Sequence, residues 1–110
     1  MSLFSRTPST DAAGLDERLG GRDVYVLDVR QAGEWRRGHI RTSVNLPLPQ
    51  LKRKLEALPR DRTIVAVCAS GHRSAAAARV LRRAGFEVEN LKGGMHGWNR
   101  AGLPVERRGR

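Results

Sequence analysis

The sequence predicts an α/β fold with a mainly parallel sheet. Short apolar segments typical of strands alternate with segments of helical pattern along the chain. Two of the apolar segments, residues 24–29 and 64–67, are apolar almost throughout, which is typical of strands buried on both faces of a parallel sheet. With 110 residues the chain suits one domain, which we place at residues 6–106, with flexible termini at 1–5 and 107–110.

The N-terminal half contains two predicted helical segments and two predicted strands. Thr10 is a candidate N-cap for a helix over residues 11–19, which ends at two glycines. The apolar strand at 24–29 comes next and is followed by a short helical turn at 34–36. A short strand at 44–46 ends before a proline, a residue that cannot donate to a sheet.

The C-terminal half continues the alternation. Leucines at helical spacing predict a helix whose apolar stripe belongs to the core: Leu48, Leu51, Leu55 and Leu58. The second buried strand leads into a polar segment at 68–74, and an alanine-rich helix is predicted over 75–84, with a glycine at its end. A strand at 87–91 and a last short helix that carries Trp98 complete the predicted fold.

Composition and charge narrow the function classes without choosing one. No apolar run approaches the ~20 residues of a membrane-spanning helix, and residues 1–10 lack the apolar stretch of a secretory signal. A single cysteine cannot form an internal disulfide, so we expect a cytoplasmic location. The formal net charge of +10 favours small anionic substrates and also permits nucleic-acid binding.

Cys68 is the best candidate for a reactive group. A lone cysteine is usually a small buried apolar residue, but Cys68 stands between a buried strand and a predicted helix. Loop N–H groups and the helix N-terminus both stabilise an anion there, so we expect a lowered pKa and a nucleophilic thiolate. Gly71 lets the loop turn tightly, Arg73 and Ser74 add donors, and His72 is expected to shape the substrate site.

Four motifs, in this order along the chain, resemble those of the rhodanese family. The segment Cys-Ala-Ser-Gly-His-Arg-Ser at residues 68–74 is similar to the active loop of single-domain members. The other three motifs are Asp28-Val29-Arg30, then Glu34-Trp35 with Gly38-His39-Ile40 and Asn45-Leu46-Pro47, and finally Leu91-Lys92-Gly93-Gly94-Met95 with Gly97-Trp98. The resemblance covers nearly the whole chain, from about residue 24 to residue 104.

The resemblance implies a single rhodanese-like domain with a five-stranded parallel sheet and helices on both faces. It also implies a sulfurtransferase, in which Cys68 takes sulfane sulfur from a donor such as thiosulfate and carries it as a persulfide. Cyanide, a thiol or a partner protein would then accept the sulfur, and no cofactor is implied. The outer sulfur would be held, much as in an oxyanion hole, by a loop of Ala69, Ser70, Gly71, His72, Arg73 and Ser74.

Residues outside the loop are predicted to support it. Asp28, Arg30 and Glu34 are expected to form a polar brace, in which the resemblance pairs Arg30 with Glu34. His39 is expected to make a structural hydrogen bond. Arg73 has two open roles, contact with an anionic donor or bracing of the loop. The three histidines lie far apart in the sequence, so we expect no metal site.

Two rival functions come from different classes. Cysteine-dependent phosphatases and arsenate reductases also use a thiolate and a loop arginine, but only four residues separate Cys68 from Arg73, which suits one sulfur better than a tetrahedral oxyanion. Some rhodanese-like domains are non-catalytic binding modules, although the intact loop favours chemistry. A sulfur relay would use the same persulfide, and the basic surface could recruit an acidic partner protein, or tRNA in a thiolation pathway.

Overall fold

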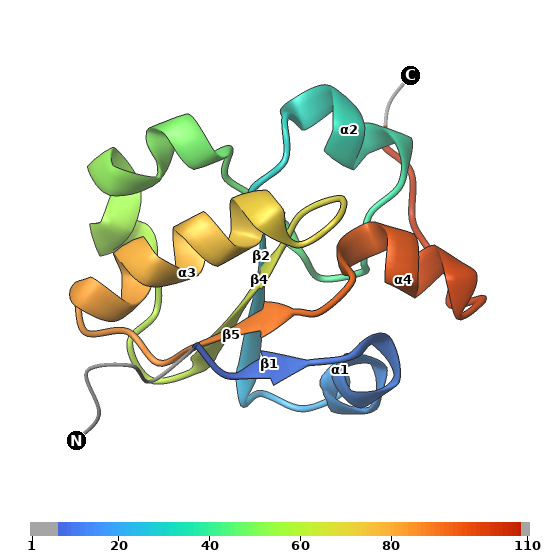
Figure 1. The fold of residues 1–110 in the computed structure, drawn as a ribbon, viewed down its shortest axis with the longest axis horizontal. Coiled ribbons are helices and arrows are strands. Elements are labelled where there is room, and N and C mark those ends of the chain that lie inside the picture. The colour runs from blue at the N-terminus through green and yellow to red at the C-terminus, as the bar shows by residue number, and fades with distance from the viewer. Residues whose placement is uncertain (1–6, 109–110) are drawn as a thin grey trace.

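Strands and helices alternate along residues 7–108, the part of the chain that the computed structural model describes (Figure 1). No helix in this range is long and apolar enough to cross a membrane. In chain order the elements are β1 (Ser9–Thr10), α1 (Ala12–Arg18), β2 (Val24–Asp28), α2 (Ala32–Arg37), β3 (Val44–Asn45), the 3-10 helix η1 (Leu48–Ala57), β4 (Thr63–Val67), α3 (His72–Arg83), β5 (Val88–Leu91) and α4 (Gly94–Arg100).

The strands form one sheet in the order β1-β5-β4-β2-β3, and every pairing is parallel. β2 and β4 lie side by side in the middle, with Val26 opposite Val65 and Asp28 opposite Val67. Because all strands run the same way, their carboxyl ends meet at one edge of the sheet, and the loops at that edge can build a common site. The predicted α/β class and the five-stranded parallel sheet are confirmed.

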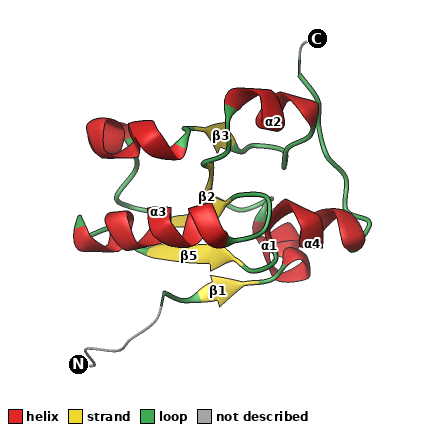
Figure 2. Ribbon diagram, turned by 45° about the horizontal axis from the view of Figure 1, so that its top comes forward, coloured by secondary structure: helices red, strands yellow, loops and turns green. Residues whose placement is uncertain are grey.

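Helices cover both faces of the sheet, as predicted (Figures 1 and 2). Side chains of β4 and the residue after it alternate between two cores. Ile64, Ala66 and Cys68 pack with α3 and η1 on one face. Val65 and Val67 pack with α1 and α4 on the other face. This double burial explains why the strand is a continuous apolar run in the sequence.

The N-terminal boundary differs from the prediction in two respects. Asp11, and not Thr10, caps α1, since its carboxylate accepts a 2.8 Å hydrogen bond from the Gly14 N–H. Thr10 lies instead in β1, where its carbonyl accepts a hydrogen bond from the Lys92 N–H at 2.8 Å. β1 was not predicted, because a strand of two polar residues, Ser9 and Thr10, has no apolar pattern.

The helix after Cys68 begins earlier than predicted. α3 starts at His72, and Gly71 is its N-cap with φ +109°, a conformation that favours glycine. Residues 72–74 therefore form the first turn of the helix, and the loop itself is only residues 69–71. The predicted leucine helix is a 3-10 helix, η1, with non-helical backbone angles at Lys54, and its leucines pack in the core as expected.

The C-terminal segment is tied to α2. Arg107 and Arg108, which the sequence analysis places in a flexible terminus, donate hydrogen bonds of 3.1 and 3.0 Å to backbone carbonyls at the end of this helix. The other residues predicted to be flexible, 1–5 and 109–110, lie outside the described residues. The domain limits of 6–106 stay a prediction.

α4 packs directly against the residues that follow β4. The Met95 N–H donates to the Cys68 carbonyl at 2.8 Å, and the His96 N–H donates to the Ala69 carbonyl at 3.0 Å. Gly94 has φ +56°, and a Cβ there would lie 2.5 Å from the Cys68 carbonyl oxygen. Only glycine allows this close approach, so Gly94 fixes the position of α4 beside Cys68.

Replacing Gly94 by alanine is expected to lower the free energy of unfolding by about 2–4 kcal/mol, since the left-handed backbone and the clash both act against the side chain. Gly102→Ala is the matched control, because Gly102 has φ +76° but no atom within 4 Å of the added Cβ. The control should lose only about 1–2 kcal/mol. Equal losses in denaturant unfolding of the two variants would contradict the close packing at Gly94.

Candidate functional site

Cys68 lies at the carboxyl edge of the sheet, where open α/β folds bind ligands. It is the first residue after β4, and its exposed fraction is 0%. The Gly71 N–H donates to the sulfur at 3.0 Å, and the Ser74 hydroxyl oxygen lies 3.3 Å from it. The loop and the first turn of α3 thus enclose the sulfur between them.

The surroundings of Cys68 favour a thiolate. Burial by itself raises the pKa of the Cys68 thiol, because a buried charge loses its hydration. Hydrogen bonds from the Ser74 hydroxyl and from the backbone N–H groups of Ser74, Gly71 and Ser70 act in the opposite direction and outweigh burial. The pKa of Cys68 therefore lies below its ordinary value of 9.0. A thiol of this kind is a nucleophile.

The remaining loop side chains face outward. Ser70 and His72 are exposed, and the Ser70 hydroxyl lies 3.0 Å from Nδ1 of His72. Neither side chain hydrogen bonds to the sulfur of Cys68 within the described residues. On the inner side of the turn, the Asn90 amide nitrogen of β5 lies 3.5 Å from the Gly71 carbonyl oxygen, at the long limit for a hydrogen bond.

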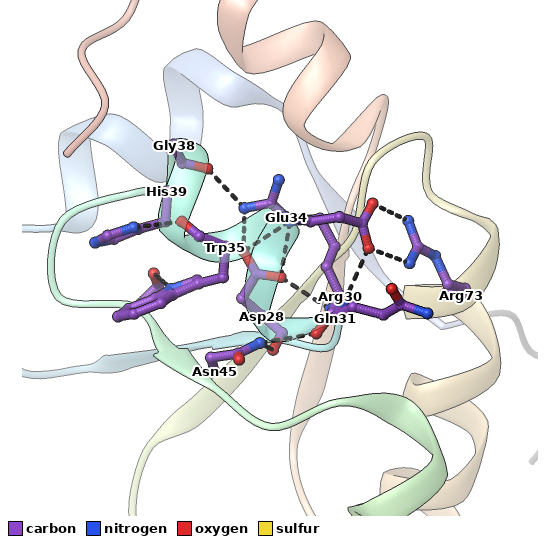
Figure 3. A network of polar contacts seen from close by, with 10 residues as sticks. Asp28, Arg30, Gln31, Glu34, Trp35, Gly38, His39, Asn45 and Arg73 are labelled. Atoms are coloured by element: carbon purple, nitrogen blue, oxygen red, sulfur yellow. Dashed lines mark hydrogen bonds and ion pairs between the residues drawn. The ribbon is translucent and has the colours of Figure 1, made fainter. Parts of the chain in front are cut away.

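The expected polar brace is present, but its pairing differs from the prediction (Figure 3). Arg30 pairs with Asp28, and not with Glu34. Its Nε and Nη2 atoms lie 2.8–3.1 Å from the Asp28 carboxylate, and Nη2 also donates to the Gly38 carbonyl at 2.8 Å. Asp28 is fully buried at the end of β2, so it requires a close cation more than the partly exposed Glu34 does.

Glu34 pairs instead with Arg73. Two guanidinium nitrogens of Arg73 donate to the two carboxylate oxygens of Glu34 at 2.7 and 3.0 Å (Figure 3). Arg73 and a further hydrogen bond from the Gln31 N–H outweigh partial burial and lower the pKa of Glu34 to about 2. The sequence leaves two roles open for Arg73, contact with a donor or bracing of the loop. In the structure Arg73 braces the loop, because its contact with Glu34 joins α2 to the first turn of α3.

His39 makes the structural hydrogen bond that the sequence analysis expects. Nδ1 of this buried side chain lies 2.7 Å from the Trp35 carbonyl oxygen, and its ring stacks on the Trp35 ring with centroids 3.8 Å apart. The Trp35 indole N–H donates to the Ser43 hydroxyl at 2.9 Å. These contacts fix the segment that follows α2, and none of them involves the loop.

A pocket of about 240 Å³ opens beside the loop. It lies between the α2 region and α4, and Ala69 is the loop residue in its wall. The other lining residues are Arg30, Glu34, Arg37, Gly38, Met95, His96 and Asn99. Arg37, His96 and Asn99 were not predicted as site residues, because Arg37 belongs to α2 and the other two belong to α4, and no sequence spacing relates the two helices. Within residues 7–108, no group of three or more His, Cys, Asp or Glu side chains could hold a metal ion.

Comparison with known families and proteins relates the sequence and the fold to rhodanese-like domains. The sequence profile of the rhodanese-like domain family matches residues 11–101. A sulfurtransferase of Allochromatium vinosum is 36% identical over 97 residues, which are 86% of this chain and 91% of that protein. The crystal structure of a rhodanese-related protein from Thermoplasma volcanium superimposes with a TM-score of 0.84 and 38% identity over 89% of this chain and 96% of that one.

One relative has a different kind of name. An HTH-type transcriptional regulator of Mycobacterium tuberculosis is 41% identical over 106 residues. The match covers 94% of this chain but only 47% of the regulator, so this chain spans about half the length of that relative. The shared region therefore occurs both in proteins of about this size and as one part of a larger protein.

Replacing Glu34 by Gln should lower the free energy of unfolding by up to about 1 kcal/mol at neutral pH, the usual range for a partly exposed ion pair. The folded-state pKa of about 2 lies below the ordinary 4.5, so the pair stabilises the fold above pH 4.5 and loses this effect as the pH falls toward 2. The stability difference between the variant and the unmodified protein should therefore vanish across this interval in urea unfolding.

Glu56→Gln, at an exposed residue outside the ion pairs of the described chain, is the control. A difference that persists at pH 2 would contradict the pairing.

Replacing Ser74 by Ala should raise the pKa of Cys68, since a hydrogen bond to the thiolate is lost. Such bonds are worth about 1.5–3 kcal/mol, so the thiolate fraction below the pKa should fall about tenfold or more. The ultraviolet absorbance of the thiolate, titrated against pH, measures this change. In the control Ser70→Ala, the lost hydroxyl bonds to His72 and not to the sulfur. Matching titration curves for the two variants would show that the Ser74 hydroxyl does not stabilise the thiolate.

Proposed function

The chain belongs to the rhodanese-like domain family, and from this premise we propose that it transfers sulfane sulfur through a persulfide on Cys68. The observation that carries the proposal is the set of hydrogen-bond donors around the sulfur of Cys68, which lower its pKa despite full burial. A thiolate is the form that attacks sulfur, and the donors that lower the pKa of Cys68 increase the thiolate fraction at neutral pH.

In the first step, the Cys68 thiolate attacks the sulfane sulfur of a donor, for which thiosulfate is the simplest candidate. A bond forms between the Cys68 sulfur and the sulfane sulfur, while the sulfur–sulfur bond of thiosulfate breaks. Sulfite leaves with the electron pair of that bond, and Cys68 becomes a persulfide whose outer sulfur carries the negative charge.

The charge of the outer sulfur needs donors of the kind that Cys68 already has. The Gly71 N–H and the Ser74 hydroxyl lie within reach of the sulfur, and the loop and first helical turn supply further N–H groups between Ala69 and Ser74. Donors fixed by the fold stabilise a charge without reorganising when it moves, as they do in oxyanion holes. We propose that the same donors serve the thiolate and the persulfide in turn.

In the second step, an acceptor thiol attacks the outer sulfur. The thiol proton passes to that sulfur, the bond to the Cys68 sulfur breaks, and the electron pair returns to Cys68 as its thiolate. Cys68 is the only cysteine among these 110 residues, so none of them supplies a second thiol as acceptor. Both steps require a reduced thiol, and this supports the cytoplasmic location expected from the sequence.

The arrangement of Arg73 favours sulfur transfer over phosphatase chemistry. A loop arginine that binds a tetrahedral oxyanion must direct its nitrogens toward the site of the anion. Here two nitrogens of Arg73 bond to Glu34, and the loop is only residues 69–71. The short loop and the engaged arginine therefore suit one added sulfur atom better than an oxyanion with four oxygens.

The test is the intact mass of the reduced protein after incubation with thiosulfate. We expect a gain of one sulfur atom (~32 Da), reversed by cyanide and absent from the Cys68→Ser variant, as nucleophilic sulfur carriage requires. Thermal unfolding of the variant should remain close to that of the unmodified protein and serves as the control for folding. A gain of mass in Cys68→Ser would contradict the assignment of Cys68. No gain with thiosulfate or with sulfur delivered by a cysteine desulfurase, while the thiol stays free, would favour a non-catalytic binding module.

A further inference from the structure

His72 has an exposed side chain that is held in place beside the Cys68 loop. It is the first residue of α3. The chain before and after it contacts the Cys68 sulfur, through the Gly71 N–H at 3.0 Å and the Ser74 hydroxyl at 3.3 Å. Nδ1 of His72 lies 3.0 Å from the Ser70 hydroxyl oxygen. The imidazole therefore lies on the solvent side of the loop that encloses the sulfur, with one of its nitrogens anchored.

The contact with Ser70 leaves the second imidazole nitrogen free for chemistry. A hydroxyl oxygen can accept a hydrogen bond as well as donate one, so Nδ1–H can donate to Ser70 while Nε2 keeps its lone pair. Within residues 7–108, Nε2 makes no hydrogen bond and no carboxylate forms an ion pair with the ring. The neighbouring cation, Arg73, is held by Glu34. Nε2 is thus a base that no group of the described chain occupies, in an orientation that Ser70 fixes.

The two steps of the proposed function differ in their need for such a base. The first step moves no proton, because a thiolate attacks thiosulfate and sulfite leaves as an anion. In the second step the proton of the acceptor thiol has to reach the outer sulfur, yet these two sulfur atoms form the new bond. A proton that passed directly between them would lie beside this bond, far from the linear geometry that a hydrogen bond prefers. The second step therefore favours a third group that takes the proton from one sulfur and gives it to the other.

We propose that His72 carries this proton in the second step and that Ser70 positions it. Nε2 takes the proton of the acceptor thiol, and the sulfur, now a thiolate, attacks the outer sulfur of the persulfide. The imidazolium gives the same proton to the outer sulfur, while the bond to Cys68 breaks and its electron pair returns to Cys68. The imidazole ends neutral, as it began. The inference rests on the proposed function and adds no reactant to it.

The test compares two acceptors after Cys68 has been loaded from thiosulfate and the loading has been verified by mass. In mildly alkaline buffer, 2-mercaptoethanol brings a proton on its sulfur, whereas the sulfite dianion brings none and reverses the first step. His72→Asn retains a hydrogen-bonding group for Ser70 but has no basic nitrogen. It should slow transfer to 2-mercaptoethanol about a hundredfold, the lower end of the range for general acid–base catalysis. Loading, transfer to sulfite and the titration of the Cys68 thiolate should all match those of the unmodified protein.

Two further variants separate proton transfer from a role in shaping the loop. Ser70→Ala should slow transfer to 2-mercaptoethanol by about three- to tenfold, the effect of one lost hydrogen bond. It should have no further effect in the His72→Asn background, because Ser70 acts only through the imidazole. His72→Ala should transfer sulfur to 2-mercaptoethanol faster when imidazole is added to the buffer, whereas the unmodified protein should not respond.

Equal slowing of His72→Asn with 2-mercaptoethanol and with sulfite would overturn the inference, because it would assign His72 to the shape of the loop. Unchanged transfer to the thiol would also overturn it, as would additive effects of the Ser70 and His72 substitutions or no response of His72→Ala to imidazole. Failure of the unmodified protein to load sulfur would count against the proposed function. Loading followed by thiol transfer that does not depend on His72 would count against this inference alone.

Discussion

A charged sulfur inside a protein requires hydrogen-bond donors that replace the water it has lost. The fold places Cys68 where such donors are available, between the end of a central parallel strand and the first turn of a twelve-residue helix. Gly71 completes the turn between them, and its N–H faces the sulfur. On the other side, Gly94 lets α4 approach the carbonyls of Cys68 and Ala69. Most of the backbone features at this edge of the sheet thus serve one side chain.

Two ion pairs hold the polar side of the same edge, and they have different physical roles. Asp28 and Arg30 are both buried, so each compensates the loss of hydration of the other, and separating them would leave a buried charge. Glu34 and Arg73 are partly exposed and gain little from each other in stability. Their contribution is geometric, because the bidentate contact joins α2 to the turn that surrounds the sulfur.

The sequence predicts the features that depend on local pattern. The strands at β2 and β4 are apolar on both faces, and Cys68 follows one of them directly, so the sheet and the reactive residue could be located. Features that depend on distant neighbours could not be predicted. Thr10 pairs with β5 instead of capping a helix, and Arg30 bonds to Asp28 because that carboxylate is the buried one. Arg37 of α2 and Asn99 of α4 line the same pocket, and no sequence spacing predicts that they lie close together.

The large positive charge of the chain affects the encounter with anions and does not select among them. A net charge of +10 attracts every anion, but at physiological ionic strength its field is screened over about 8 Å. It can therefore raise the rate of encounter with thiosulfate, an anionic thiol or a nucleic acid, and it does not distinguish among them. Selection requires donors at fixed places, and two arginines near the loop are held by carboxylates of the chain, Arg30 by Asp28 and Arg73 by Glu34. The donors that face a charged sulfur at Cys68 are therefore the Ser74 hydroxyl and the N–H groups of the loop and the first helical turn.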